Sequence, residues 1–340
     1  MVESAFVNGQ GYFMKAVICS SYGPPDNLKL EEVDEPTADD NQAIVEVYAA
    51  SLNFPDGLQI QGKYQFQPPM PFTPGSEVAG KIKEVGSKLV GFNVGDRVMA
   101  IPGIGGLAES VAVQSEGLRK IPDNMDFKTA ASFAMVYTTS YYALKQRANL
   151  KAGETLLVLG ASGGVGLTAV ELGKLMGARV IAAASSDEKL DFIRQLQPDS
   201  LVNYKKQDLK ETVKDLTDGK GADVIYDPVG GDLFDQCCRC INWNGRLLVI
   251  GFTSGRIPSY KANLSLLKGS SMVGVFLGRF RKEEPVAYEE NFEELLELFR
   301  QGKLKPIVTK SFALPKYADA FNVFTERKVM GKVTLEVRPE

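Results

Sequence analysis

The first third of the chain consists of short apolar runs separated by Gly and Pro. Clear examples lie at residues 43–48, 76–82, 96–100 and 109–113. Runs of this length between turn-forming residues are typical of β-strands. We therefore predict a compact β-rich unit with little helix between residue 14 and about residue 120.

From residue 155 the pattern changes to an alternation of apolar strands and amphipathic helices. Strands are predicted at residues 155–159, 179–184, 200–204, 222–226 and 246–251. Helices are predicted near residues 164–176, 188–196 and 208–217. This alternation is typical of a doubly wound parallel sheet, so we predict an α/β protein with a Rossmann second domain.

Both ends of the chain carry weaker patterns. Residues 269–277 form an apolar run that we expect to be the last strand of the parallel sheet. Helices are predicted at residues 291–301 and 315–327, and a strand at residues 331–337. Residues 1–13 show no periodicity and are either a native extension or a segment added before a natural start at Met14.

The composition is that of a globular protein without a strong charge bias. Hydrophobic residues make up 44% of the 340 positions and charged residues 24%, and the formal net charge is −3. We therefore expect neither nucleic acid nor a membrane as partner, since no apolar run approaches the roughly 18 residues of a membrane helix. Four cysteines without framework spacing and no recognisable signal peptide favour a reducing compartment: the cytoplasm or, in a eukaryote, alternatively the mitochondrial matrix.

The chain contains no histidine, which restricts its chemistry. Ser-His-Asp and Cys-His nucleophilic catalysis are excluded, and the commonest zinc ligand is missing. The clustered Cys237, Cys238 and Cys240 could hold a metal or a redox centre, but they also suit a hydrophobic core at the end of a predicted helix. The reaction must therefore use a cofactor or Tyr, Lys, Asp, Glu, Ser or Cys side chains.

A glycine-rich turn lies between the strand at residues 155–159 and the helix that follows it. Its key residues are Gly160, Ser162, Gly163, Gly164, Val165 and Gly166. Without side chains, the backbone N–H groups can approach a pyrophosphate, which the positive end of the helix also favours. The strand, turn, helix and second strand together predict a dinucleotide site. The alternative is a tight turn in an α/β domain that binds no nucleotide.

The end of the second strand bears on the choice of cofactor. NAD-binding domains usually place Asp or Glu there to bind the adenosine ribose. This chain has small neutral residues instead, and four nearby side chains could bind the 2′-phosphate of NADPH: Ser185, Ser186, Lys189 and Tyr204. Asp187 and Glu188 add opposing charge, and Ser186 and Lys189 could equally be a helix cap and a solvated side chain. We predict that the cofactor is NADPH.

Several motifs together resemble the medium-chain dehydrogenase/reductase superfamily, most closely its zinc-independent quinone oxidoreductase branch. They lie at residues 53–56, 62–64, 74–80, 94–98, 160–166, 227–231 and 331–333. The resemblance runs from about Met14 to Val337, nearly the whole chain. It implies a GroES-like β-rich catalytic domain at residues 14–138 and 278–340, and a Rossmann NADPH-binding domain at residues 139–277.

The chain departs from the zinc-containing members of that superfamily. At the positions that correspond to their catalytic zinc ligands it has Asn53, Ser76 and Met135. These three side chains cannot form a closed zinc site, so we expect no metal.

Further site residues follow from the resemblance alone. Asn53 would contact the nicotinamide ribose and the substrate, unless it only forms a turn. Tyr64 would be the proton donor, unless it only lines the cleft. The other residues expected around the nicotinamide are Thr138, Val229, Gly251, Phe252, Thr253, Phe276 and Leu277.

The predicted function is NADPH-dependent reduction of a quinone or another electron-poor alkene or enone, by hydride transfer without a metal. Two alternatives stay open: an enoyl thioester (enoyl-CoA or acyl-carrier-protein) reductase, and a crystallin-like or RNA-binding protein that retains NADPH binding. We also expect a homodimer. The apolar strand at residues 269–277 would be unsafe as a free edge, and the superfamily pairs this strand across a two-fold axis.

Overall fold

The computed structural model describes residues 12–340, and their contacts divide them into two compact units. The first unit contains the described residues up to Ser132, together with Lys310–Arg327 and Val333–Glu340. The second unit contains Phe133–Thr309 and Lys328–Lys332. Of the segment at residues 1–13, positions 1–11 lie outside the described residues.

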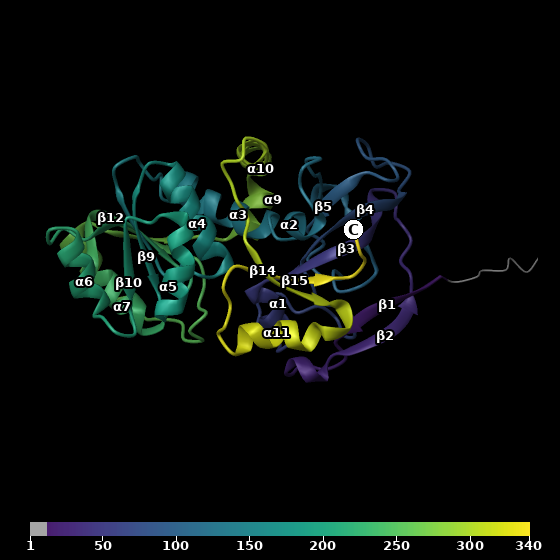
Figure 1. The fold of residues 1–340 in the computed structure, drawn as a ribbon, viewed down its shortest axis with the longest axis horizontal. Coiled ribbons are helices and arrows are strands. Elements are labelled where there is room, and N and C mark those ends of the chain that lie inside the picture. The colour runs from purple at the N-terminus through teal and green to yellow at the C-terminus, as the bar shows by residue number, and fades with distance from the viewer. Residues whose placement is uncertain (1–11) are drawn as a thin grey trace, which may run out of the picture. The chain divides into compact units, whose positions relative to one another are not determined.

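The first unit is built around an antiparallel sheet, as the β-like runs predicted (Figure 1). Its strand order is β14-β15-β3-β4-β5-β7, with β6 also paired to β3, while β1 and β2 form a separate pair. The strands are β1 (Phe13–Ile18), β2 (Lys29–Asp34), β3 (Gln42–Leu52), β4 (Glu77–Val85), β5 (Arg97–Ala100), β6 (Ser110–Gln114), β7 (Leu118–Lys120), β14 (Val308–Ala313) and β15 (Lys332–Glu336). The helices are α1 (Phe54–Gln59), α2 (Phe127–Ala131) and α11 (Tyr317–Thr325), with short 3₁₀ turns at Pro25–Asn27, Ser115–Gly117 and Leu314–Lys316.

Strand β3 organises this unit. It pairs antiparallel with β4 along most of its length, with β6 at its start and with β15 at its end. Because it has partners on both sides, its backbone polar groups are satisfied and its side chains are almost all buried. The strand leads through Asn53, the N-cap residue, into α1, which carries Asp56; both residues are discussed below.

The second unit contains a six-stranded sheet in the order β10-β9-β8-β11-β12-β13, in which every pairing is parallel. This is the 3-2-1-4-5-6 order of a Rossmann fold, so the predicted fold class is confirmed. The strands are β8 (Thr155–Val158), β9 (Arg179–Ala184), β10 (Ser200–Asn203), β11 (Ala222–Asp227), β12 (Ile241–Val249) and β13 (Ser271–Gly274). The helices are α3 (Ala134–Tyr142), α4 (Gly164–Leu175), α5 (Asp187–Ile193), α6 (Leu209–Leu216), α7 (Gly231–Cys240), α8 (Ala262–Lys268), α9 (Leu277–Glu283) and α10 (Pro285–Arg300), with a π-helical turn at Ala143–Arg147 and a 3₁₀ turn at Arg194–Leu196.

Helices cover both faces of the parallel sheet. On one face α6 and α7 bury a core that includes Leu157, Ile181 and Ile225 from the strands. Cys237, Cys238 and Cys240 belong to this core as free thiols, and burial raises the pKa of Cys238 to about 11, so that its thiol stays neutral. These contacts favour a packing role for the cysteines over a redox one.

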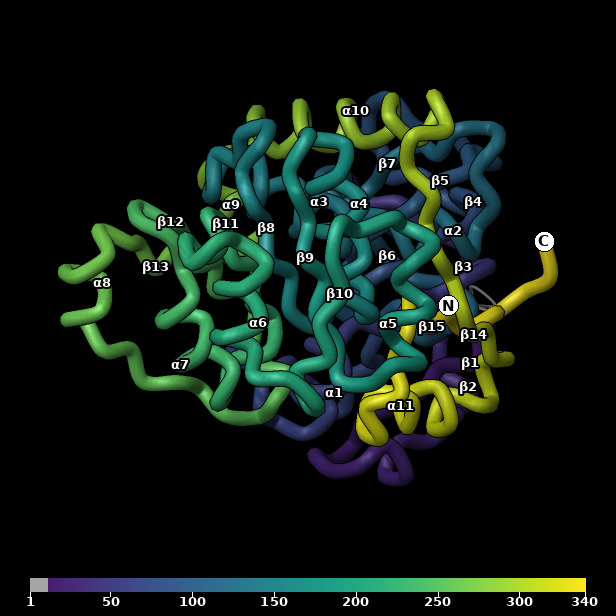
Figure 2. The backbone as a smooth tube through the Cα atoms, turned by 60° about the vertical axis from the view of Figure 1, so that its left-hand side comes forward, coloured from purple at the N-terminus to yellow at the C-terminus, as the bar shows by residue number. Residues whose placement is uncertain are grey.

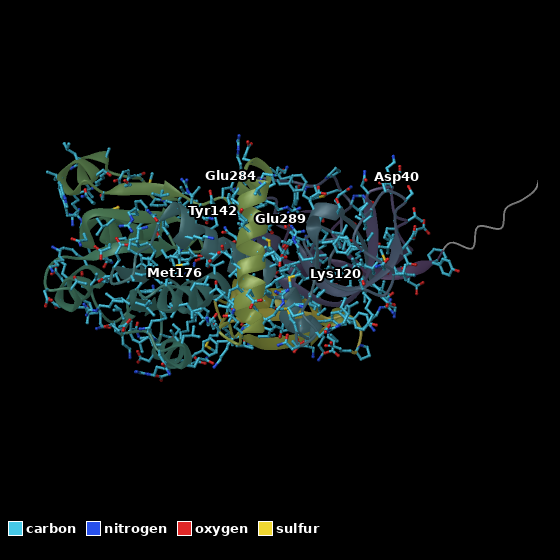
Figure 3. All side chains as sticks on the ribbon, turned by 90° about the horizontal axis from the view of Figure 1, so that it is seen from above. Asp40, Lys120, Tyr142, Met176, Glu284 and Glu289 are labelled. Carbon is cyan, nitrogen blue, oxygen red and sulfur yellow. The ribbon has the colours of Figure 1, made fainter. Side chains whose placement is uncertain are left out.

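Residues 278–309, which the sequence placed with the catalytic domain, belong by their contacts to the second unit, and α10 packs against α3 there. Tyr141 of α3 donates to Glu294 of α10 at 2.5 Å. Phe133, which precedes α3, packs edge to face against Phe299 of α10, with 5.9 Å between the ring centroids. Glu284, between α9 and α10, lies near enough to Tyr142 for its charge to act on that phenol; both residues are labelled in Figure 3. Helix α10 starts at Pro285, six residues before the predicted Asn291, since Pro is preorganised for the first helical position.

The last strand of the parallel sheet is shorter than predicted. Residues 269–277 were expected to be extended, but β13 covers only Ser271–Gly274. It pairs with β12, and both are labelled in Figure 2. Its partner β12 ends at Val249, and the bond from the Val275 N–H to Val249 O at 3.1 Å is the last one between them. Phe276 therefore has no strand to pair with, and Leu277 begins α9, so the prediction that both end a strand was wrong.

Candidate functional site

The glycine-rich turn in the second unit has the geometry of a phosphate cradle. Gly160 has a φ of +55°, which favours glycine, and its carbonyl accepts the Gly163 N–H at 3.0 Å. A Cβ on Gly166 would lie 2.2 Å from the same carbonyl oxygen, too close for any side chain. The turn thus requires glycine at both positions and presents bare backbone at the start of α4, where a pyrophosphate fits.

The loop after β11 lies against this turn, and together with the loop after β12 it contains four of the expected residues. A Cβ on Gly160 would contact Val229 at 3.2 Å, so the two positions are adjacent. The Thr253 N–H donates to Pro228 O at 3.0 Å, and Gly251 and Phe252 lie in the same loop. The structure thus brings Val229, Gly251, Phe252 and Thr253 together at the carboxyl end of β11 and β12, where ligands of doubly wound sheets bind.

The segment Lys328–Lys332 also reaches the glycine-rich turn. The Gly331 N–H donates to Ser162 O at 2.8 Å, and Gly331 forms a parallel bridge with Gly163. Lys332 is buried, and its Cδ lies 3.1 Å from where a Cβ of Gly164 would be. In the sequence this Gly-Lys pair is only part of the family resemblance, and no local pattern links it to a turn about 170 residues earlier.

The carboxyl end of β9 has the neutral character expected from the sequence. Ser186 caps α5 by accepting the Lys189 N–H at 3.3 Å, and Lys189 Nζ lies 3.5 Å from Ser185 Oγ. The Tyr204 N–H donates to Ala184 O at 3.2 Å, so the next strand tip is held beside the two serines. The structure therefore gathers Ser185, Ser186, Lys189 and Tyr204 at one end of the sheet.

Two residues near that end were not considered from the sequence. Asn203 Nδ2 donates to Asp187 Oδ1 at 2.6 Å, and Lys206 Nζ makes a short ion pair with Asp187 Oδ2. Lys206 and then Asn203 hold the pKa of the Asp187 carboxyl below its ordinary value, so it is charged at neutral pH. The Asp187 carboxylate is thus paired with the positive charge of Lys206 and bound by Asn203, and both partners lie at the end of the next strand, β10.

Thr138 and Phe276 are placed differently from the residues above. The Thr138 hydroxyl is buried inside α3 and donates to Ala134 O at 2.5 Å, which uses its only donor within the helix. Phe276 is 57% exposed and precedes α9. Their expected contacts with a nicotinamide stay predictions.

In the first unit, Asn53 is held by two carboxylates at the start of α1. Its backbone N–H donates to Asp56 Oδ2 at 2.7 Å, and its Nδ2 donates to Glu77 Oε2 at 3.1 Å. Asp56 and Glu77 are completely buried, and Asn53 is 9% exposed. The Asn53 amide is therefore fixed by Glu77, and its oxygen faces away from Glu77 and accepts the Asp56 N–H in a capping box at the start of α1.

Tyr64 lies beyond α1, in the same unit and partly buried. Burial raises the pKa of its phenol, and the nearby charge of Asp56 raises it further. A phenol in such a setting stays protonated at neutral pH and can donate a proton or a hydrogen bond. This state suits an acid.

Two features are missing from the described part of the chain. Residues 12–340 contain no group of three or more His, Cys, Asp or Glu side chains that could hold a metal ion. None of the helices in the same range is long and apolar enough to cross a membrane.

The comparisons with known proteins agree with this architecture. Residues 39–123 match the model of the alcohol dehydrogenase GroES-like domain, and residues 164–301 match that of the zinc-binding dehydrogenases. The chain is 40% identical to a quinone oxidoreductase-like protein 2 homolog of Nematostella vectensis, over 95% of this chain and 89% of the relative.

Two solved structures extend the comparison. The quinone oxidoreductase of Escherichia coli complexed with NADPH is 25% identical, with a TM-score of 0.88 over 95% of this chain and all of the other. The CurK enoyl reductase is 28% identical, with a TM-score of 0.86 over 96% of this chain and 99% of the other. Both units and nearly the full length are thus shared with reductases of one kind: the chain belongs to the zinc-independent quinone oxidoreductase branch of the medium-chain dehydrogenase/reductase superfamily.

Proposed function

We propose that this protein is an NADPH-dependent reductase of quinones or other electron-poor alkenes and enones. The observation that carries the proposal is the glycine cradle at Gly160–Gly166 next to a β9 end with serines in place of a carboxylate. NADPH, when bound, supplies the hydride. The protein binds and orients the reactants and handles the proton.

The named residues have separate roles in this proposal. Ser185, Ser186, Lys189 and Tyr204 bind the 2′-phosphate, and the backbone of the glycine turn binds the pyrophosphate. Asn53, fixed by Asp56 and Glu77, accepts a hydrogen bond from the nicotinamide ribose or the substrate. Thr138, Val229, Gly251, Phe252, Thr253, Phe276 and Leu277 surround the nicotinamide. The Escherichia coli relative, solved with NADPH, supports this cofactor.

A second candidate is an enoyl thioester reductase. The protonated Tyr64 supports it, because reduction of an unsaturated thioester requires protonation at the α-carbon. The likeness to the CurK enoyl reductase is a further support.

Steady-state NADPH oxidation with a panel of quinones, enones and enoyl-CoA esters tests the proposal. We expect the highest kcat/KM with an ortho-quinone or an enone. A preference for enoyl-CoA would favour the second candidate. Tight NADPH binding with no turnover of any substrate would favour a crystallin-like or RNA-binding role.

Lys189→Ala tests the assignment of the 2′-phosphate site. Loss of one charged hydrogen bond should weaken NADPH by about 1–2 kcal/mol, or roughly 5- to 30-fold in Kd, and leave NADH almost unchanged. The Kd of each cofactor can be measured by fluorescence titration. Equal losses for both would show that Lys189 does not contact the phosphate.

We also propose a homodimer formed along β13, the free edge of the parallel sheet. Met272 on this strand is 48% exposed, and the neighbouring Leu266, Leu267 and Phe276 are 83%, 70% and 57% exposed. An apolar edge of this kind is stabilised by pairing with a second copy. Light scattering at micromolar concentration should give twice the chain mass, and Met272→Asp should give a monomer. A monomeric wild-type protein would refute this assignment.

A further inference from the structure

Asp187 is a carboxylate placed where the proposed cofactor brings negative charge. It directly follows Ser185 and Ser186, which are proposed to bind the 2′-phosphate. A phosphate monoester carries about −1.5 to −2 charges at neutral pH, so an uncompensated carboxylate nearby would repel it. A chain that binds NADPH must therefore keep the Asp187 charge from repelling the 2′-phosphate.

The structure shows that the Asp187 carboxylate is held on the side of the turn after β10. Asn203, which binds Oδ1, is buried and is fixed in turn. Its N–H donates to Gln207 Oε1 at 2.9 Å, and its side-chain oxygen accepts the Lys205 N–H at 3.1 Å. The Asn203 side chain is therefore held between the Asp187 carboxylate and the Lys205 N–H.

Lys206 supplies the compensating charge. Its Nζ pairs with Asp187 Oδ2, and both side chains are more than half exposed, at 68% and 59%. An ion pair this exposed contributes little to folding stability. Its main effect is on the position of the Asp187 carboxylate, because Lys206 and Asn203 together hold that charge on the side of the turn after β10.

We propose that Lys206 determines cofactor specificity: by holding the Asp187 carboxylate on the side of the turn after β10, it leaves the end of β9 able to accept the 2′-phosphate of NADPH. Lys206 acts through Asp187 and does not itself bind the phosphate, so it is a positioning residue. The proposal rests on the NADPH-binding role argued above.

A double-mutant cycle with binding as the readout tests this role. Lys206→Gln, Asp187→Asn and the double variant are titrated with NADPH and with NADH, and Lys205→Gln serves as the control that removes the same charge one position away. Lys206→Gln should weaken NADPH about threefold to tenfold and change NADH less than about twofold. In the Asp187→Asn background the same substitution should cost less than about twofold, and Lys205→Gln should have little effect in either background.

Each other outcome counts against the proposal in a distinct way. An equal loss of NADPH affinity with and without the Asp187 charge would mean that the Lys206 charge acts on the phosphate itself and not through Asp187, which overturns the proposed role. A clear NADPH preference that Lys206→Gln leaves unchanged would overturn it too, but would keep the proposed function. A wild-type protein that binds NADH as tightly as NADPH would refute the cofactor assignment and this inference together.

Discussion

Tyr64→Phe is expected to slow the reduction of an enone or enoyl thioester by about 10²- to 10⁴-fold, the usual contribution of a positioned acid. Hydride addition to such a substrate leaves an α-carbon that must be protonated. With an ortho-quinone the product is a stabilised hydroquinone anion that water can protonate, so the loss should stay under about tenfold. The substitution removes only the hydroxyl, and the ring keeps its packing.

The raised pKa of Tyr64 predicts a pH dependence for the same reaction. Burial, followed by the charge of Asp56, moves the phenol's pKa upward, so the acid form persists throughout the neutral range. Enone reduction by the wild-type enzyme should therefore lose activity through this group only when the pH passes that pKa, above the ordinary value of about 10 for tyrosine. In the Phe variant this alkaline loss should disappear.

Tyr22→Phe is the matched control for Tyr64→Phe. Tyr22 belongs to the same unit, and its ring packs over Gly62, two residues before Tyr64. Tyr22→Phe removes the same hydroxyl group from a tyrosine ring. The kcat/KM of this variant should stay near the wild-type value with both the enone and the quinone. A loss of more than about a hundredfold with quinones in Tyr64→Phe, at unchanged NADPH affinity, would show that the role of the acid is misassigned.

Gly166→Ala is expected to damage both the fold and the cofactor site. The new Cβ would lie 2.2 Å from Gly160 O and 2.8 Å from Ala161 Cα, and both are backbone atoms that cannot move aside alone. Overpacking of this kind costs about 1–3 kcal/mol of unfolding free energy. The displaced turn should also weaken NADPH by at least about tenfold, since misplaced N–H groups lose charged hydrogen bonds. Urea denaturation and cofactor titration measure the two effects.

Gly163→Ala provides the comparison for stability. A Cβ at this position would lie 3.5 Å from Gly160 O, an ordinary contact, and its φ of −79° suits any residue. We expect its unfolding free energy to change by less than about 0.5 kcal/mol. Equal destabilisation by the two substitutions would contradict the steric explanation.

The sequence by itself determined the elements whose signals are local. The strand at Arg179–Ala184 was predicted with its exact bounds, because a buried parallel strand is continuously apolar and ends at a change to polar residues. The Gly160–Gly166 turn was recognisable because the backbone conformation of Gly160 and the close contacts of Gly166 permit only glycine at these two positions. The sequence likewise identified the neutral end of β9, and the structure shows the helix cap that the sequence left open as the alternative role of Ser186.

Only the tertiary structure decided which distant residues act on those elements. That Lys206 pairs with Asp187, and that Gly331 binds the Ser162 carbonyl, depends on strands that become neighbours after folding. The end of β13 was missed because it is set by the end of its partner β12, not by its own apolar residues. Apolar and turn patterns report each residue's own environment, whereas a pairing depends on chain segments far away in sequence, and a single sequence carries no local signal for it.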